Sequence, residues 1–398
     1  MALQGGGGPV GIFDHTKPGR IDANPPSLSG HKGQALDFDF NPFHEHVIAT
    51  CSDDMTLKIW GIPQEGLTET ITEPLAELKG HGRKVTICKF HPTAANVLSS
   101  LSGDHTVKLW DIEKGVNMCT FEGHTDLIQD IAWDYLGRSF ATSCKDKVVR
   151  FVDGRSAEET MSIKDAHEGA KSVKLTFLGS KEKLVSFGFT KQSQRQLKVW
   201  DPRDVSKPLV TTQIDQAAGV IMPFYDNDTN ILYAAGKGDG NVRYYECVDE
   251  KPFCFPLSEY RSTEACKGMT FLPKRACDVM KCETAIALKL TGSTVQPLKF
   301  VVPRKSDAFQ VTCSIGGGGV CGEHRALPPG DKPNCTHCLV PLARSGGPVP
   351  AHVQRRALSH GGRVEGRQRQ APEALLARPC RWWQGGGQHG VHGAGPCG

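Results

Sequence analysis

The sequence repeats a unit, and this repeat limits the possible folds more than any other feature. Histidines that follow Gly or Ala stand at positions 31, 81, 124 and 167, so they are separated by 50, 43 and 43 residues. Periods of about 40 to 50 residues are typical of chains that stack one small structural unit many times. The fold must therefore place the same unit at successive positions along the chain.

The second half of each unit ends in alternating apolar and polar residues. The copies read SDDMTLKIW (52–60), SGDHTVKLW (102–110), CKDKVVRFV (144–152), SQRQLKVW (193–200) and GDGNVRYY (238–245). In four copies an aspartate stands six residues before the closing residue: Asp54 before Trp60, Asp104 before Trp110, Asp146 before Val152 and Asp239 before Tyr245. The remaining copy has Gln194 before Trp200. Alternation with period two indicates β-strands.

Further strand candidates precede this run, at 35–40 and 47–51 in the first unit, with the turn residues Asn41 and Pro42 between them. Four short strands per repeated unit predict the blade of a β-propeller. The sequence indicates blades at about 30–62, 80–112, 123–153, 167–201, 217–247 and 266–301, and residues 1–29 resemble half of another blade. We therefore expect an all-β, seven-bladed propeller over 30–310 with an incomplete first blade at 1–29.

The recurring His, Asp and Trp positions suggest a buried hydrogen-bonded set. An imidazole would link the turn aspartate to a hydroxyl beside the indole, because buried polar groups need such partners. The structural positions that we assign are His31, Asp54, Trp60, His81, Asp104, Trp110, His124, Asp146, His167, Trp200, Asp239 and Tyr245. The alternative is that the histidines are metal ligands or catalytic bases. Their recurrence at the same point of successive units favours the structural role.

A glycine-rich stretch, GKGDG at 236–240, raises the question of phosphate binding. A phosphate-binding loop of the G-x-x-x-x-G-K-[ST] type leads from a strand into a helix whose N-terminal amides face the anion. The residues that follow here, NVRYY, have the pattern of a strand. We interpret the stretch as a tight turn between strands, in which Gly supplies positive φ and Asp239 is the turn aspartate.

Three blocks of sequence are more specific than the repeat itself: GVIMPFYDNDTNILYAAGKGDGNVRYYE (219–246), GMTFLPKRACDVMKCE (268–283) and VPRKSDAFQ (302–310). They resemble the coronins, which are actin-binding WD-repeat proteins, and the resemblance extends over about 5–310. It implies a seven-bladed WD-repeat propeller that binds actin filaments in actin cytoskeleton organisation, is cytoplasmic and located at the actin cytoskeleton, and has other actin-regulatory proteins as further partners. It also implies that the chain is not an enzyme and needs no cofactor.

The sequence departs from the coronin pattern at both ends. Only Met1 to Gln4 precede the GGGG stretch, where coronins have a basic segment and the first half of a blade. Their C-terminal extension and coiled coil have no counterpart after Gln310. We therefore expect no oligomerisation through a coiled coil. Because an incomplete ring exposes strand edges, the alternative function is a generic WD-repeat scaffold or adaptor that has lost actin binding.

Basic residues near turns are the candidate actin contacts. They are Lys237, Lys274, Arg275, Arg304 and Lys305. The competing interpretation is that they are ordinary solvated loop residues. No nucleophile elbow, H-E-x-x-H or complete P-loop occurs, so the motifs of common enzyme classes are missing from the sequence.

Residues 311–398 differ in composition from the rest of the chain. They contain 18 glycines, 9 prolines and six of the 15 cysteines, with nine arginines and a single lysine. We interpret this Gly/Pro/Arg/Cys-rich segment as a disordered tail, of the kind that a shifted reading frame or a read-through intron would encode. The alternative is a zinc site at Cys335 and Cys338, whose C-x-x-C spacing lacks a second pair.

Charge and hydropathy narrow the partners further. The net charge of +4 arises from the tail, so residues 1–310 have no basic excess that would indicate a specific nucleic-acid partner. No run of 18 apolar residues exists to span a membrane. The nine cysteines before residue 311 lie mostly in apolar strands, and we expect them to be reduced and structural.

Overall fold

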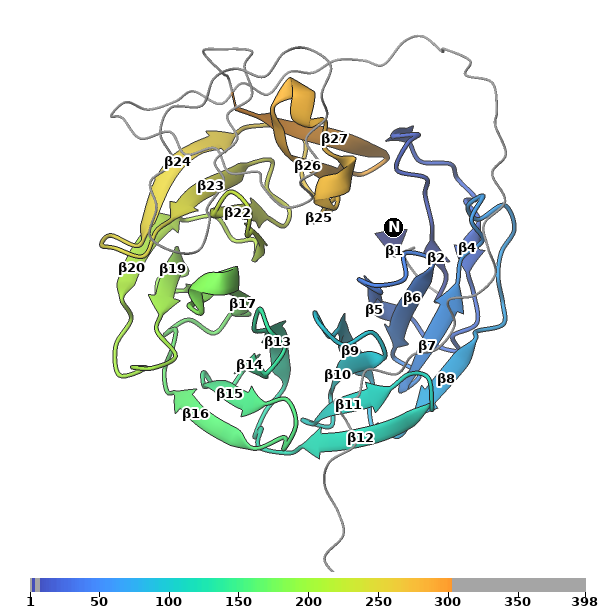
Figure 1. Ribbon diagram of the computed structural model, residues 1–398, viewed down its shortest axis with the longest axis horizontal. Helices are drawn as coiled ribbons and strands as arrows, with labels where there is room; N and C mark the ends of the chain where they lie inside the picture. The colour runs from blue at the N-terminus through green and yellow to red at the C-terminus, as the bar shows by residue number, and fades with distance from the viewer. Residues whose placement is uncertain (1, 4–7, 303–398) are drawn as a thin grey trace, which may run out of the picture. The chain divides into compact units, whose positions relative to one another are not determined.

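The computed structural model describes residues 2–3 and 8–302, and their regular structure is almost entirely β-strand (Figure 1). The strands in the first half are β1 (Ala2–Leu3), β2 (Val10–Gly11), β3 (Gly19–Arg20), β4 (Ser27–Leu28), β5 (Ala35–Phe40), β6 (Val47–Ser52), β7 (Thr56–Gly61), β8 (Ala76–Lys79), β9 (Val85–Phe90), β10 (Val97–Ser102), β11 (Val107–Asp111), β12 (Val116–Phe121), β13 (Ile128–Trp133) and β14 (Ser139–Cys144). Those in the second half are β15 (Val149–Asp153), β16 (Glu159–Ile163), β17 (Lys174–Phe177), β18 (Leu184–Phe189), β19 (Arg195–Trp200), β20 (Val210–Asp215), β21 (Ile221–Asp226), β22 (Ile231–Gly236), β23 (Val242–Cys247), β24 (Cys254–Tyr260), β25 (Gly268–Phe271), β26 (Glu283–Leu290) and β27 (Thr294–Val301). Three short 3-10 helices are η1 (Gly179–Lys181), η2 (Lys274–Ala276) and η3 (Val279–Lys281).

Among the described residues, the strands form six sheets of four strands and one sheet of three. Five of the four-stranded sheets take four consecutive strands each, from β5–β8 to β21–β24, and every pairing within them is antiparallel. Among these five sheets, the first strand of each contacts the first strand of the next, as β5 contacts β9 and β13 contacts β17. Figure 1 shows these sheets one after another around a common axis, with the first strands innermost. This is the arrangement of propeller blades.

The second strand of each blade is the most deeply buried. Burial is continuous along β6, β10, β14, β18 and β22, apart from the first residue of four of them. These strands are rich in apolar, Ser and Thr residues because both of their faces pack against neighbouring blades, so no polar face is needed. The fourth strands, such as β12 and β24, are largely exposed.

The hydrophobic core is divided among the spaces between consecutive sheets. One cluster joins β5–β8 to β9–β12 through Leu57, Leu98 and Trp110, and another joins β17–β20 to β21–β24 through Phe187 and Tyr245. The sheet of β1, β2 and β4 packs on β5–β8 in the same way, through Val10 and Leu28. Each blade therefore depends on its neighbours for burial, as in other repeat proteins.

The last four-stranded sheet takes one strand from the start of the chain. β25, β26 and β27 are joined by β3, which lies in the segment 1–29 that we expected to be part of a first blade. The pairing of β3 with β27 is short, since it joins only Thr294 to Arg20 and Val295 to Gly19. The seven-bladed count and the incomplete first blade stay predictions.

Each expected blade range contains three strands of the structure, and the fourth strand of the sheet lies outside it. β5 and β6 match the strands expected at 35–40 and 47–51. The fourth strands of the first four blades, β8, β12, β16 and β20, lie beyond the ranges that end at 62, 112, 153 and 201. Within the described part of the chain, no helix is long and apolar enough to cross a membrane. Residues 303–398, including the expected tail at 311–398, lie outside the described residues.

Candidate functional site

A series of hydrogen bonds crosses the first blade from the indole of Trp60 to the turn aspartate. Trp60 Nε1–H donates to Thr50 Oγ1 (2.8 Å), and Thr50 Oγ1 lies 2.7 Å from His31 Nε2. His31 Nδ1 lies 3.0 Å from Asp54 Oδ2. Because a carboxylate only accepts, Nδ1 carries the proton and Nε2 accepts from the Thr50 hydroxyl. The series fixes the link before β5 against the turn between β6 and β7.

The protonation states in this blade suit a structural role. Burial lowers the pKa of His31, so the ring is neutral near pH 7. Burial acts to raise the pKa of Asp54, but hydrogen bonds from the Thr56 hydroxyl, the Lys32 N–H and His31 outweigh it and lower that pKa to about 2. Both ring nitrogens of His31 are thus occupied, and neither is free to act as a base or to bind a metal.

The second blade repeats the same arrangement with serine in place of threonine. Trp110 Nε1–H donates to Ser100 Oγ (2.8 Å), which lies 2.7 Å from His81 Nε2. His81 Nδ1 lies 3.0 Å from Asp104 Oδ2. The near-identical distances follow from the identical spacing of the four residues in the two units.

The third blade keeps the histidine and aspartate but separates them with an arginine. His124 Nε2 lies 3.2 Å from Thr142 Oγ1, and Arg150 Nη1 lies 3.3 Å from His124 Nδ1. Arg150 in turn pairs with Asp146 at 2.8 Å. Val152 replaces the tryptophan, so no indole donates to Thr142. Burial, together with the charge of Arg150, lowers the pKa of His124 to about 4.

The fourth blade has no turn carboxylate, and its histidine is left with one unsatisfied nitrogen. Ser186 Oγ lies 2.8 Å from both His167 Nε2 and Trp200 Nε1. His167 Nδ1 is buried without a hydrogen-bond partner. Burial, with the nearby charge of Lys198 as the second cause, lowers the pKa of His167 to about 3.

In the fifth blade, the turn aspartate Asp239 pairs with Arg195 of the fourth blade, a residue that the repeat did not indicate. Arg195 is 1% exposed and donates to Asp215 (2.6 Å from Nε) and to Asp239 (2.8 Å from Nη2). The turn aspartate therefore binds the preceding blade instead of a histidine in its own. Tyr245, at the closing position, is buried in the core between the two blades. The sequence indicates this pair only through a basic residue, Arg195, that follows Gln194, the residue standing where the other units have the turn aspartate.

The GKGDG stretch is the turn between β22 and β23. Gly238 has φ of 81°, and Asp239 Oδ1 accepts a hydrogen bond from the Asn241 N–H (3.1 Å). A Cβ on Gly240 would lie 1.7 Å from the backbone oxygen of Ser262, so only glycine fits this approach. Strand β23 follows directly, so within the described residues the turn leads into a strand and not into a helix. The side chain of Lys237 is exposed at the tip.

One end of the blades brings the recurrent histidines and aspartates together. In a meander of four strands, the second-to-third turn lies at the same end as the link to the next blade, and the other two connections lie at the opposite end. We call the first end the His–Asp face, formed by residues 29–34, 53–55, 80–84, 103–106, 122–127, 145–148, 164–173, 190–194, 216–220, 237–241 and 261–267. The histidines, turn aspartates and Lys237 all belong to it.

Exposed basic residues outnumber exposed acidic residues on the His–Asp face. The exposed basic residues are Lys32, Arg83, Lys84, Lys145, Lys147, Lys164, Lys191, Lys237, Arg261 and Lys267. The exposed acidic residues are Asp53, Glu122, Asp165, Glu168 and Glu264. The sequence interpretation identified Lys237 alone among these lysines and arginines. The others flank the repeat's histidines and turn aspartates, so aligning the units and counting charge beside those positions would have found many of them.

Lys274 and Arg275 lie at the opposite end of the blades, in η2 between β25 and β26. Lys274 is ion-paired with Asp226 and donates to the carbonyl oxygen of Thr284 (2.5 Å). Arg275 is ion-paired with Glu45. The structure thus separates these two residues from Lys237, and both have acidic partners within the described chain.

The remaining candidates lie outside the described residues. These are Arg304 and Lys305 of the proposed actin contacts, and Cys335 and Cys338 of the proposed zinc site. Among residues that the structure describes, no group of three or more His, Cys, Asp or Glu side chains is placed to hold a metal ion.

Comparison with known proteins agrees with the repeat. The family model described as "WD domain, G-beta repeat" matches residues 25–61, 72–111 and 115–153. Coronin-A of Dictyostelium discoideum is 49% identical over 305 residues, which are 77% of this chain and 68% of that protein. Coronin-2B of Homo sapiens is 45% identical over 307 residues, which are 77% of this chain and 64% of that protein. The chain thus spans about two thirds of the length of these relatives.

A solved structure supports the same assignment at the level of the fold. The WD40 domain of a Toxoplasma gondii coronin superposes with a TM-score of 0.67 at 32% identity, covering 71% of this chain and 74% of that one. The fold, the repeat and two curated relatives therefore agree with the three blocks of sequence noted above. The chain belongs to the coronin family and is an all-β WD-repeat propeller.

Proposed function

We propose that this chain is a coronin-type propeller that binds actin filaments and that its His–Asp face makes the contact. The observation that supports the proposal is the excess of exposed lysine and arginine on that face, including Lys237 in the block that most resembles coronins. A basic surface attracts an acidic filament, speeds their encounter and orients the two partners.

The arrangement suits a binding module better than an enzyme. The histidines of the first two blades use both ring nitrogens in buried hydrogen bonds, and those of the third and fourth blades are buried as well. We infer that the chain has no catalytic activity and acts in the cytoplasm at the actin cytoskeleton, where other actin-regulatory proteins are further partners.

Actin co-sedimentation with charge-reversed variants tests the proposal. Lys237→Glu and Lys84→Glu should each weaken binding by about fivefold, the equivalent of about 1 kcal/mol. Lys207→Glu is the matched control, because Lys207 is also exposed but lies between β19 and β20 at the opposite end of the blades. Binding that weakens equally in all three variants, or in none, would show that another surface meets actin.

The second candidate function, a WD-repeat adaptor without actin binding, is favoured by a groove at that opposite end. The groove has a volume of about 360 Å³, and Tyr135, Leu136, Phe151, Phe177 and Pro202 contribute its apolar lining. Tyr135 and Leu136 are 48% and 50% exposed, so two adjacent large apolar side chains are open to a partner at this groove. A folded chain that fails to pellet with actin at every salt concentration would support this function instead.

A further inference from the structure

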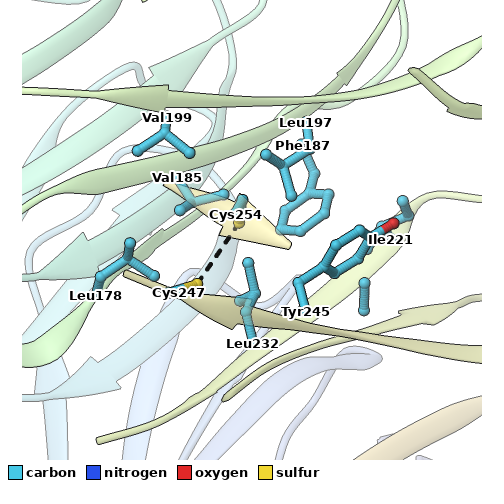
Figure 2. Packing of buried hydrophobic residues seen from close by; sticks show 11 residues of the cluster. Leu178, Val185, Phe187, Leu197, Val199, Ile221, Leu232, Tyr245, Cys247 and Cys254 are labelled. Atoms are coloured by element: carbon cyan, nitrogen blue, oxygen red, sulfur yellow. Dashed lines mark hydrogen bonds between the residues drawn. The ribbon is translucent and has the colours of Figure 1, made fainter. Parts of the chain in front are cut away.

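Two cysteines face each other at the turn end of the β23–β24 hairpin. Cys247 is the last residue of β23, Cys254 is the first residue of β24, and the two are partners in the strand register. Their Sγ atoms lie 3.6 Å apart, and both thiols are free. Figure 2 shows them pointing toward each other within the cluster formed by Leu178, Val185 and Leu232.

The backbone geometry of this pair is compatible with a disulfide bond. The Cys247 N–H donates to the carbonyl oxygen of Asn230 (2.8 Å), on the side of β22. Since the N–H and C=O of one strand residue point to the same side, Cys247 and Cys254 form a non-hydrogen-bonded pair. Such pairs have Cα atoms about 4.5 Å apart, within the range of about 4.4–6.8 Å that disulfides span.

Another neighbouring pair of cysteines lacks this geometry. Cys51 and Cys88 both belong to the core between the first two four-stranded blades, but they lie on β6 and β9 of different sheets. Both side chains are completely buried, that of Cys51 at the penultimate residue of β6 and that of Cys88 in the middle of β9. They are therefore an internal control: oxidation that requires paired strands and a nearby turn open to solvent should occur at Cys247 and Cys254 and not at Cys51 and Cys88.

Access to the hairpin pair is through the turn at 248–253. Cys247 and Cys254 are 1% and 6% exposed, whereas residues 249–252 are exposed. The hydrogen bond to Cys254, with burial as the second cause, raises the pKa of Cys247, so the closed hairpin contains unreactive thiols. Because both thiols are buried, their reaction with a reagent in solvent requires the turn to open. Residue pairs at the end of a strand ladder open more readily than central pairs.

Two lysines hold this turn closed. Lys181 Nζ lies 2.8 Å from Asp249 Oδ2, and Lys183 Nζ lies 3.0 Å from Asp249 Oδ1. Both lysines belong to the connection between β17 and β18, so the ion pairs join the turn to the preceding blade. Removing the charge of Asp249 should loosen the turn without changing either cysteine.

We propose that Cys247 and Cys254 are a dithiol site that small disulfides such as oxidised glutathione convert into an intrachain disulfide. The Cys254 thiolate attacks one sulfur of the reagent, forms a mixed disulfide and releases one glutathione thiolate. Cys247 then attacks the Cys254 sulfur and releases the second glutathione. The two protons of the protein thiols end on the two released glutathiones, and the two electrons reduce the reagent.

Peptide mapping of the full chain in glutathione redox buffers tests this site. After alkylation of free thiols, cleavage at Glu246, Glu250 and Glu259 separates residues 247–250 from 251–259. We expect these two peptides to be joined by a bond that dithiothreitol reverses, and Cys51 and Cys88 to be alkylated only after unfolding. Alkylated 247–250 and 251–259 peptides, or glutathione that stays attached to Cys254, would overturn the proposal.

Two variants test the route to the site. Cys247→Ser should stop oxidation at the mixed disulfide on Cys254, with a far-ultraviolet circular dichroism spectrum like that of the parent chain. Asp249→Asn should speed disulfide formation several-fold because it weakens both lysine contacts. An unchanged rate in Asp249→Asn, or oxidation that occurs equally fast at Cys51 and Cys88, would show that general unfolding and not the hairpin exposes the thiols.

Discussion

Replacing Thr50 with valine should destabilise the first blade through a defined electrostatic cause. Thr50 is completely buried, and its hydroxyl connects Trp60 to His31. Valine has nearly the same shape, so packing is kept while the hydroxyl is lost. The change leaves the indole N–H of Trp60 without an acceptor and His31 Nε2 without a donor. Each buried polar atom that loses its partner costs about 1–3 kcal/mol, so the two atoms together give a total of about 2–6 kcal/mol.

The third blade offers a matched control for this prediction. Thr142 is as completely buried as Thr50, but Val152 stands where the tryptophan would be. The Thr142 hydroxyl lies 3.2 Å from His124 Nε2 and donates to the carbonyl oxygen of Arg150 (3.5 Å), which is a main-chain group within the sheet. Thr142→Val therefore strands one polar atom instead of two. We expect it to cost about 1–3 kcal/mol, roughly half of the cost of the change at Thr50.

Urea unfolding of the two variants and the parent chain, followed by circular dichroism, measures both losses of unfolding free energy. Refolding on dilution checks that the transitions are reversible. If Thr142→Val destabilises the chain as much as Thr50→Val, the cost arises from packing or backbone effects of the substitution itself. The reasoning from stranded hydrogen bonds would then be wrong.

Three further changes have expected outcomes that follow from single sites. Burial lowers the pKa of His167 from 6.5 to about 3, so on acidification the unfolded chain binds a proton before the folded chain does. The free energy of unfolding should therefore fall by about 1.4 kcal/mol per pH unit between pH 6.5 and about 3. The urea midpoints at pH 7 and 4.5 should differ less in His167→Gln than in the parent chain. Arg195→Ala should cost about 3–5 kcal/mol because it removes a buried guanidinium and leaves the partly buried carboxylate of Asp239 without its ion pair, whereas Asp215 keeps Arg243. Arg203→Ala, at a residue whose side chain is 80% exposed, should cost under about 1 kcal/mol, and equal thermal shifts for the two variants would contradict this. Gly240→Ala should prevent normal packing of its turn, whereas Gly292→Ala meets no atom within 4 Å, and similar melting temperatures for the two would refute the close approach.

Much of the fold could be predicted because each blade is encoded locally. The spacing from His31 to Asp54 and Trp60 recurs at His81, Asp104 and Trp110, and the structure gives both sets the same hydrogen bonds. The fourth strand of each blade was harder to place. It is short or largely exposed, as in β8 and β12, so its sequence lacks the apolar alternation that marked the others.

The candidate surface was only partly predictable, because exposure and pairing depend on which loops meet. Lys237, Lys274 and Arg275 look alike in the sequence, as basic residues beside turns. The fold places Lys237 on the His–Asp face and the other two at the opposite end, where Asp226 and Glu45 neutralise them. Those acidic partners are 48 and 230 residues away, so no local pattern indicates them.

The sequence by itself determined the repeat, the strand pattern and the coronin family, because these reside in spacings within single blades and in contiguous blocks. The tertiary structure alone decided which residues act between blades. Arg195 reaches Asp239 in the next blade, β3 completes the last sheet, and Cys247 meets Cys254 across a hairpin. The physical reason is that each blade buries its apolar faces only against its neighbours, so the contacts that distinguish one propeller from another form only when the blades come together.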